Sequence, residues 1–238
     1  MMGFADVHSH FVYGMDDGAR TRSDMEAMLD AAHADGIVSL FATPHVVPGV
    51  QPFDFGLYQG RLEEARRYCR EKGYPMTLLS GAEVLYTPAL RQHLQEHELP
   101  VLGDSDRVLL EFVPDVAFQE MEAALSMLRR AGYAAVLAHI DRYECLFHGR
   151  NAERLKARFD VGFQVNAGAV LGRQGLFRTW KIRGWFQKRL VDFVASDAHH
   201  VRRRPFQMKA AYAALERRWG SEYAGALTRS AGDLQRHG

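Results

Sequence analysis

Short apolar runs alternate with helical patterns along the whole chain, and no long stretch rich in Pro, Gly or Ser divides it. The apolar run at residues 37–42, for example, follows a helical pattern that ends at Gly36. Repeated strand-then-helix units build parallel sheets, because each helix carries the chain back to the same edge. We therefore expect one α/β domain over residues 1–238 with about seven strands. The expected strands are residues 4–7, 37–42, 76–79, 107–112, 134–138, 163–165 and 191–195.

Local signals predict several helix boundaries between these strands. Ser23, with Glu26 three residues later, fits a capping box, which satisfies free N–H groups at a helix start. A polar helix is expected over residues 57–72, with Gly73 closing it. Pro205 is expected to open a helix after the last strand, since proline is favoured in the first helical turn.

Most of the predicted strands end in a histidine or an acidic residue, in segments 6–10, 81–83, 110–112, 138–139 and 195–199, with another at 43–45. In a closed barrel the C-terminal ends of all strands open on one face, whereas an open sheet concentrates its site at one switch point. Nearly every strand contributes here, and the chain has no G-x-G-x-x-G or P-loop sequence. We therefore predict a distorted TIM-like (β/α)7 barrel.

The strand ends supply nitrogen and oxygen donors suited to divalent metals. His8 and His10 project to the same side of an extended segment, because side chains alternate along a strand. A His-x-His pair alone is a weak signal that structural and surface histidines also produce. The other strand-end acids and histidines strengthen it, since a buried charge is costly unless a metal or partner compensates it. The pattern indicates a metal-dependent hydrolase.

Composition narrows the classes of partner and compartment. The formal net charge of +1 gives no global attraction to nucleic acid or to an anionic membrane. No apolar stretch approaches the ~20 residues of a membrane span, and the first residues lack the pattern of a signal peptide. Cys69 and Cys145 are too far apart for a disulfide framework or a cysteine-based zinc site. A cytoplasmic protein without a membrane span is expected.

With these segments in order, the chain resembles the bacterial polymerase-and-histidinol-phosphatase (PHP) superfamily. It looks most like the metal-dependent protein-tyrosine phosphatases of that superfamily that are associated with capsule and exopolysaccharide synthesis. Ile140-Asp141 departs from the resemblance, because this branch often has Pro-Glu there. The segments that carry the resemblance are residues 6–10, 15–18, 42–45, 81–84, 110–112, 138–143, 164–168, 196–199 and 204–206.

The resemblance implies a site with three divalent metal ions, with manganese favoured and iron or zinc possible. In that arrangement one ion would be held by His8, His10, Glu83 and Asp197. Glu83 would bridge to a second ion, held also by Glu111 and His139. The third would be held by Asp17, His45 and His199, although spacing does not separate Asp17 from its neighbour Asp16.

Clustered divalent ions lower the pKa of bound water and can supply a hydroxide that attacks a phosphate ester. Arg142 and Arg204 are the candidates for gripping the phosphate, because a guanidinium matches a phosphoryl edge and stays charged. Outside this context, either arginine would be interpreted as a surface or ion-paired residue. No phosphoenzyme is required.

Two other features have competing interpretations. The first feature is Cys145, three residues beyond Arg142, which could indicate a cysteine-based phosphatase. In those enzymes five residues separate the cysteine from an arginine, whereas only four separate Cys145 from Arg150. A cysteine without a catalytic role is therefore favoured. The second feature is a group of basic residues interleaved with two aromatic ones: Arg173, Arg178, Lys181 and Arg183 with Phe177 and Trp180. Such a group could bind an acidic peptide or nucleic acid, but a solvated amphipathic helix face is favoured.

The leading hypothesis is a metal-dependent tyrosine phosphatase, and the resemblance alone implies the tail of a bacterial tyrosine kinase as its phosphotyrosine partner. Glu111 supports this branch, because other superfamily members often carry histidine there. The alternatives are a small-molecule phosphoesterase, such as a histidinol-phosphate phosphatase, and a catalytically idle, metal-stabilised interaction module. The nearly complete ligand set argues against the idle module.

Overall fold

The computed structural model describes residues 3–50 and 52–234, and all of its paired strands run parallel. A three-stranded sheet has the order β1-β2-β4, and a six-stranded sheet has the order β3-β5-β6-β7-β8-β9. The prediction of a parallel α/β fold is confirmed. The strands are β1 (Phe4–Ser9), β2 (Ile37–Ala42), β3 (His45–Val46), β4 (Thr77–Ser80), β5 (Glu83–Leu85), β6 (Arg107–Glu111), β7 (Ala134–Leu137), β8 (Val161–Asn166) and β9 (Phe193–Ala195).

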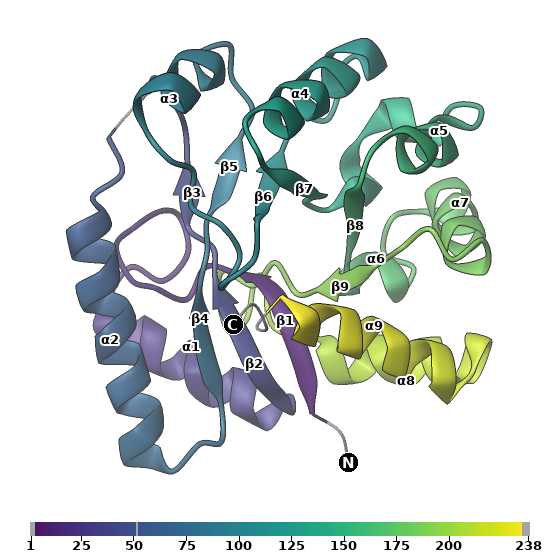
Figure 1. Ribbon diagram of the computed structural model, residues 1–238. Helices are drawn as coiled ribbons and strands as arrows, with labels where there is room; N and C mark the ends of the chain where they lie inside the picture. Colours follow the sequence, from purple (N-terminus) through teal and green to yellow (C-terminus); the bar gives the residue numbers. More distant parts are fainter. Residues whose placement is uncertain (1–2, 51, 235–238) are drawn as a thin grey trace.

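Two interrupted strands connect the sheets. The path of β2 continues into β3 after Thr43-Pro44, where proline has no N–H to donate to a ladder. Likewise β4 continues into β5 after Gly81-Ala82. The buried Tyr58 hydroxyl spans both breaks: it lies 3.0 Å from the Ala42 carbonyl oxygen and 3.1 Å from that of Gly81. Because these paths bend together, both sheets continue around one ring (Figure 1).

Backbone bonds between the end of β1 and the segment after β9 close this ring. Asp197 N–H donates to the His8 carbonyl (2.9 Å), and His10 N–H donates to the Ala198 carbonyl (2.8 Å). The seven strand paths thus form the distorted barrel expected from the sequence. Its closure brings the first and last strands, nearly 190 residues apart in sequence, to the same face.

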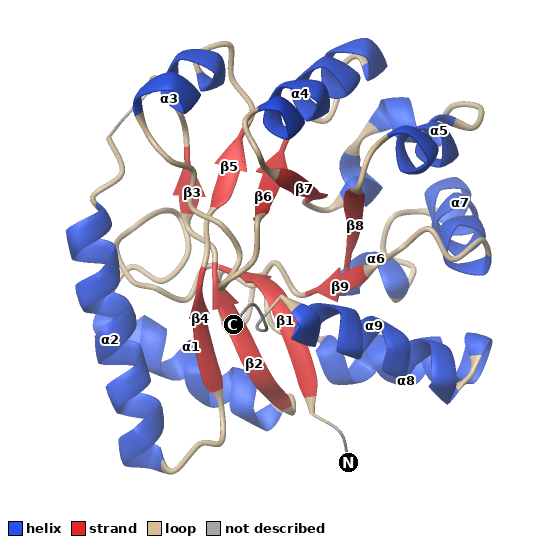
Figure 2. Ribbon diagram, in the orientation of Figure 1, coloured by secondary structure: helices blue, strands red, loops and turns tan. Residues whose placement is uncertain are grey.

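The helices lie outside the ring of strands (Figure 2). Most of the core lies between the strands and the helices. A second apolar cluster contains side chains from four strands and Leu234, the last described residue; the strand residues include Val7, Phe41, Leu109 and Val136. The helices are α1 (Arg22–Ala34), α2 (Phe55–Lys72), α3 (Leu90–Glu96), α4 (Phe118–Arg130), α5 (Asn151–Arg158), α6 (Ala167–Val170), α7 (Leu176–Gln187), α8 (Met208–Trp219) and α9 (Ser221–Asp233), with 3₁₀ turns at Ile140–Arg142 and Glu144–Phe147. Within the described residues, none of these helices has the length and apolar character needed to span a membrane.

Two predicted helix boundaries are wrong. The capping box of α1 is formed by Thr21 and Asp24 rather than by Ser23 and Glu26, because Ser23 already lies inside the helix and Glu26 pairs with Arg22. The helix expected to open at Pro205 begins at Met208.

That later start has a physical cause. The Arg204 carbonyl accepts bonds from the His199 and His200 N–H groups, which holds the preceding segment in a turn. The Asp35 carboxylate then accepts a bond from the Met208 N–H at 2.6 Å, at the first residue of α8. Gly73, in contrast, closes α2 in the left-handed conformation as expected.

Candidate metal centre

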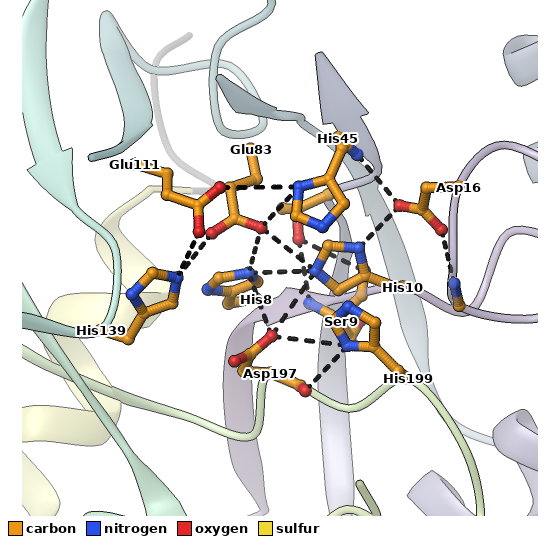
Figure 3. A network of polar contacts seen from close by, with 12 residues as sticks. His8, Ser9, His10, Asp16, His45, Glu83, Glu111, His139, Asp197 and His199 are labelled. Atoms are coloured by element: carbon orange, nitrogen blue, oxygen red, sulfur yellow. Dashed lines mark hydrogen bonds and ion pairs between the residues drawn. The ribbon is translucent and has the colours of Figure 1, made fainter. Parts of the chain in front are cut away.

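The side chains predicted to bind metal gather at the C-terminal ends of the barrel strands, where eight of them lie around one centre (Figure 3). β1 contributes His8, the residue after its end is His10, β3 contributes one histidine, and β5 and β6 contribute one glutamate each. The segments after β7 and β9 supply the remainder, and Asp17 comes from the loop after β1. The eight are His8, His10, His45, Glu83, Glu111, His139, Asp197 and His199.

The end of β1 carries His8 to the centre, and its pairing with β2 is irregular at this point. The ladder between β1 and β2 is irregular between Asp6 and Ser9. Val7 packs into the second apolar cluster, and the adjacent His8 still faces the carboxylates of the site. Such irregularities next to active sites re-aim side chains. His8 and His10 end with their Nε2 atoms 3.1 Å apart, as the predicted shared binding of one ion requires.

Glu83 is the central carboxylate. Its Oε2 lies 3.1 Å from His8 Nε2, 3.3 Å from His10 Nε2 and 3.1 Å from His45 Nδ1. Its Oε1 lies 2.8 Å from His139 Nε2, which is also 3.4 Å from Glu111 Oε1. Only 1% of Glu83 is exposed, so its charge must be balanced inside the protein.

A second group lies toward the open side of the centre. Asp17 Oδ1 is 3.3 Å from His199 Nε2 and 3.5 Å from His45 Nε2. Three sets of donor atoms lie close enough together to share an ion, and His10 and His45 each belong to two sets. The sets differ in part from the predicted division, because His10 also joins the Asp17 group and His45 joins the two glutamates. They are His10-Asp17-His45-His199, His8-His10-Asp197 and His45-Glu83-Glu111.

The donors fit divalent ions. Asp197 Oδ1 and His199 Nε2 are buried, yet neither has a hydrogen-bond partner. The Nε2 atoms of His8 and His10 face each other, so their lone pairs need a positively charged group that both nitrogens can bind. A cation satisfies all of these atoms at once, and imidazole with carboxylate is a donor set that manganese, iron and zinc accept.

Neighbouring groups leave the Nε2 atoms of three histidines facing the centre. The Nδ1 atoms of His8, His10 and His199 lie 3.1 Å from Gln164 Oε1, 2.7 Å from Asp16 Oδ2 and 3.1 Å from the Asp197 carbonyl, respectively. Each acceptor favours a proton on Nδ1, which leaves the Nε2 lone pair to a metal ion when one is bound. Asp16 also accepts the His45 N–H at 3.0 Å. Asp16 therefore orients a histidine, while Asp17 faces the second group.

Asp197 joins the metal centre to the two predicted phosphate arginines. Its Oδ2 lies 2.5 Å from Arg142 Nη2 and 2.6 Å from Arg204 Nη2. Asn166 Nδ2 donates to the same oxygen at 3.0 Å. Beside this group is a pocket of about 180 Å³, which Arg142 and Arg204 line together with Arg173. Both predicted arginines thus border a cavity next to the centre.

The electrostatics of the centre favour bound cations. Burial by itself lowers the pKa of His10, but hydrogen bonds to Asp16 and Glu83 outweigh it and raise the pKa to about 10. Burial tends to raise the pKa of Asp197, but His8, His139 and Arg142 hold that pKa well below its usual range. The carboxylates therefore carry negative charge inside the protein and attract positive charge.

The backbone at the centre is strained. His139 and Asp197 have φ angles of 30° and 53°, in the left-handed region that non-glycine residues rarely adopt. Strain of this kind persists where surrounding contacts enforce it, and it clusters at functional sites.

Three residues orient the site in ways that the sequence did not predict: Gln164 and Asn166 had no assigned role, and Asp16 was considered only as an alternative ligand to Asp17. Gln164 Oε1 accepts the His139 N–H at 2.6 Å as well as contacting His8, and Gln164 Nε2 donates to Asn166 Oδ1 at 2.8 Å. Gln164 and Asn166 lie two residues apart at the end of β8, so strand alternation was the signal that could have grouped them. Asp16 is the third.

Cys145 has the environment of an unreactive thiol. It lies in the second 3₁₀ turn and is half-buried. Burial raises the pKa of the Cys145 thiol to about 11, so it stays protonated near neutral pH.

The sequence was compared with protein families and with proteins of known activity. A family model described as "Capsular polysaccharide synthesis, CpsB/CapC" matches residues 4–233, which include every candidate site residue. The chain is 28% identical over 226 residues to the tyrosine-protein phosphatase CpsB of Streptococcus pneumoniae, covering 92% of each protein. It is 29% identical over 233 residues to the tyrosine-protein phosphatase YwqE of Bacillus subtilis, covering 98% of this chain and 91% of that protein.

A solved structure agrees with these sequence matches. The fold superposes with a TM-score of 0.87 and 29% identity on a crystal structure from work on B. subtilis YwqE and S. pneumoniae CpsB, described as unique metal-dependent tyrosine phosphatases. The match covers 98% of this chain and 94% of the other.

Proposed function

Because this chain belongs to the CpsB/CapC family of capsular polysaccharide synthesis, we propose that it is a metal-dependent protein-tyrosine phosphatase, a phosphoric monoester hydrolase. The observation that carries the proposal is the convergence of His8, His10, His45 and His139 on the single buried carboxylate of Glu83. Its relatives named above, CpsB and YwqE, are tyrosine-protein phosphatases.

We further propose three divalent ions, with manganese favoured and iron or zinc as alternatives. The first ion would be held by His8, His10, Glu83 and Asp197. The second would be held by Glu83, Glu111 and His139, and the third by Asp17, His45 and His199. When bound, such ions lower the pKa of water to near neutrality and offset the negative charge of a phosphoryl group. Three overlapping sets of donor atoms, each close enough together to hold an ion, support a centre with more than one ion.

The two arginines beside the metal centre would bind the phosphoryl group of the substrate. Arg142 and Arg204 each use one nitrogen on Asp197 Oδ2, and a guanidinium has five N–H donors, so further donors remain for phosphoryl oxygens. Asn166 shares that oxygen and holds Asp197 in place. Asp197 thereby fixes the distance between the bound phosphate and the metal ligands.

Membership of the family supports a proposal for the substrate. We propose a phosphotyrosine protein of the capsule or exopolysaccharide system, namely the phosphorylated tail of a bacterial tyrosine kinase, met in the cytoplasm. The half-exposed Arg204 and the exposed Asp17 leave the centre open on one side, which suits a side chain presented by another protein.

The proposal is tested with purified protein of measured metal content. We expect turnover of phosphotyrosine peptides well above that of phosphoserine peptides and histidinol phosphate, and loss of turnover with chelator that added manganese restores. A preference for histidinol phosphate would overturn the proposed substrate class. Metal-loaded protein that is inert toward all three substrates would instead identify an interaction module.

A further inference from the structure

Helix α7 exposes large apolar side chains beside the arginine-lined pocket. Leu176, Phe177 and Trp180 are 94%, 62% and 66% exposed, the highest values among the large apolar residues of the described chain apart from Val50. The Phe177 and Trp180 rings lie 6.4 Å apart between centroids. The segment is amphipathic as expected, with Ile182 and Trp185 buried, but its exposed face carries Phe177 and Trp180 as well as basic side chains. Exposed apolar clusters of this kind mark interaction sites.

The segment that carries this patch is strongly cationic. Residues 171–190 contain six basic side chains and no acidic one, whereas the whole chain has a formal net charge of +1. Arg178 and Lys188 pair with Glu144 and Glu153. In the described part of the chain, Arg173 and Lys181 have no carboxylate within 4.0 Å. Lys181 Nζ lies 5.5 Å from the Trp180 ring centroid, so aromatic and cationic groups form one surface.

This surface is tied to the turn that carries Arg142. Gln174 Nε2 donates to Asp141 Oδ2 at 2.9 Å, and Arg178 Nη1 donates to the Asp141 carbonyl at 3.2 Å. Asp141 immediately precedes Arg142 and also accepts the Asn166 N–H at 2.9 Å. The start of α7 is thereby fixed relative to the phosphate arginines, and Arg173 and Gln174 line the same pocket as Arg142.

We propose that Leu176, Phe177 and Trp180 form a docking surface for the polypeptide that carries the phosphotyrosine, and that Arg173 and Lys181 select carboxylates next to that tyrosine. This inference rests on the proposed function, because the tyrosine must occupy the adjacent pocket. The occupant is an extended peptide segment with acidic and aromatic or aliphatic residues close to the phosphotyrosine.

The dimensions suit such a segment. Leu176 and Trp180 are about 6 Å apart along the helix axis, and an extended chain advances about 3.3 Å per residue. Two or three substrate residues beyond the pocket would cross the patch. Apolar anchors surrounded by charged groups are the usual composition of an energetically important contact.

The test compares a peptide substrate with para-nitrophenyl phosphate, which is too small to reach the patch. The measured quantity is the ratio of kcat/KM for a phosphotyrosine peptide with acidic and aromatic neighbours to kcat/KM for the small ester. Phe177→Ala/Trp180→Ala should lower this ratio roughly 10-fold or more. Lys181→Glu should shift preference from peptides flanked by glutamate to peptides flanked by lysine.

Matched controls lie on other helices. Phe55→Ala removes an aromatic side chain of α2 that is 54% exposed, and Arg217→Glu reverses an exposed charge on α8. Neither should change the ratio. Circular dichroism of each variant establishes that it is folded, and Lys181→Glu, a surface change, gives a second test that does not depend on the aromatic pair.

The outcomes separate the two proposals. Wild-type protein that turns over both substrates, with the same ratio in all variants, would overturn the docking surface and leave the phosphatase intact. Wild-type protein inactive on both would overturn the proposed function and the docking surface with it. Loss of binding to anionic lipid vesicles in the aromatic variant, with the ratio unchanged, would assign the patch to a membrane surface instead.

Discussion

Asp16 Oδ2 lies 2.7 Å from His10 Nδ1 and leaves the opposite ring nitrogen of His10 facing the metal centre. Its neighbour Asp17 instead faces His45 and His199. Two consecutive aspartates thus have separate tasks: one orients a histidine, and the other offers an oxygen to the centre. The Asp16 side chain is only 5% exposed. The hydrogen bond to His10 contributes to the lowering of its pKa to about 2 despite the opposing effect of burial.

The first prediction separates these aspartates by metal binding. Asp16→Ala should weaken metal affinity about 10- to 100-fold, as loss of an orienting partner does, while the metal count at saturation stays unchanged. Asp17→Ala should lower the metal count itself, because it removes a direct donor. Metal titration followed by elemental analysis measures both. Equal counts in the two variants at saturation would refute the division of roles.

His139→Ala should reduce phosphatase activity by more than about 100-fold, beyond what loss of an orienting partner causes. The reason is that His139 Nε2 faces Oε1 of both Glu83 and Glu111, so its removal takes away the imidazole that these two oxygens share. His148→Ala, an exposed histidine in the next turn, is the matched control and should stay active. Steady-state kinetics with a phosphotyrosine peptide decide the point.

Arg204→Ala should lower kcat/KM about 10- to 150-fold, which corresponds to the ~1.5–3 kcal/mol of a hydrogen bond to a charged group. Metal content should be retained, because Arg204 contacts Asp197 through the oxygen that points away from the histidines. Arg202→Ala, at an exposed neighbouring position, is the control. Unchanged kinetics, or a loss of metal equal to the loss of activity, would remove Arg204 from the phosphate site.

Cys145→Ser should retain most of the activity, and alkylating reagents should not inhibit the wild-type protein. Burial raises the pKa of Cys145 to about 11, so the thiolate forms only as the pH approaches that value and is scarce at pH 7 to 8. Activity assays with iodoacetamide at pH 7.5 provide the measurement. Inhibition that Cys145→Ser prevents would point to thiolate chemistry.

Chelation should destabilise the fold. Ions that bind only the folded state stabilise it by about 2.7 kcal/mol when present at 100 times their Kd. For a chain of this size, that amounts to a decrease in Tm of about 5–10 °C on metal removal. Differential scanning calorimetry with and without chelator measures it. Glu83→Gln, which weakens the central carboxylate, should show a smaller shift, and equal shifts would indicate that the stabilising metal binds elsewhere.

Local pattern was sufficient to locate the seven strand paths, but it did not predict the separate short strands β3 and β5. The apolar run at Ile37–Ala42 and the left-handed Gly73 follow from nearest-neighbour preferences, and both lie where the sequence predicts. Eight of the nine candidate donors lie within a few residues of the end of a strand path, because parallel strands expose only that end to a common face. Asp17 is the exception and lies on the longer loop after β1. Helix boundaries were less secure. The start of α8 at Met208 depends on a distant contact with Asp35. The capping box of α1 is local, but it uses Thr21 and Asp24 instead of the equally spaced Ser23 and Glu26.

The sequence by itself determined which imidazoles and carboxylates this chain brings to one face, since strand order and strand ends fix that. Only the tertiary structure decided how they are grouped. The separate roles of Asp16 and Asp17, the convergence of both arginines on Asp197, and the outward aromatic rings of α7 depend on ring closure and on side-chain rotation. Those are set by contacts between residues far apart in the chain, which no local periodicity records.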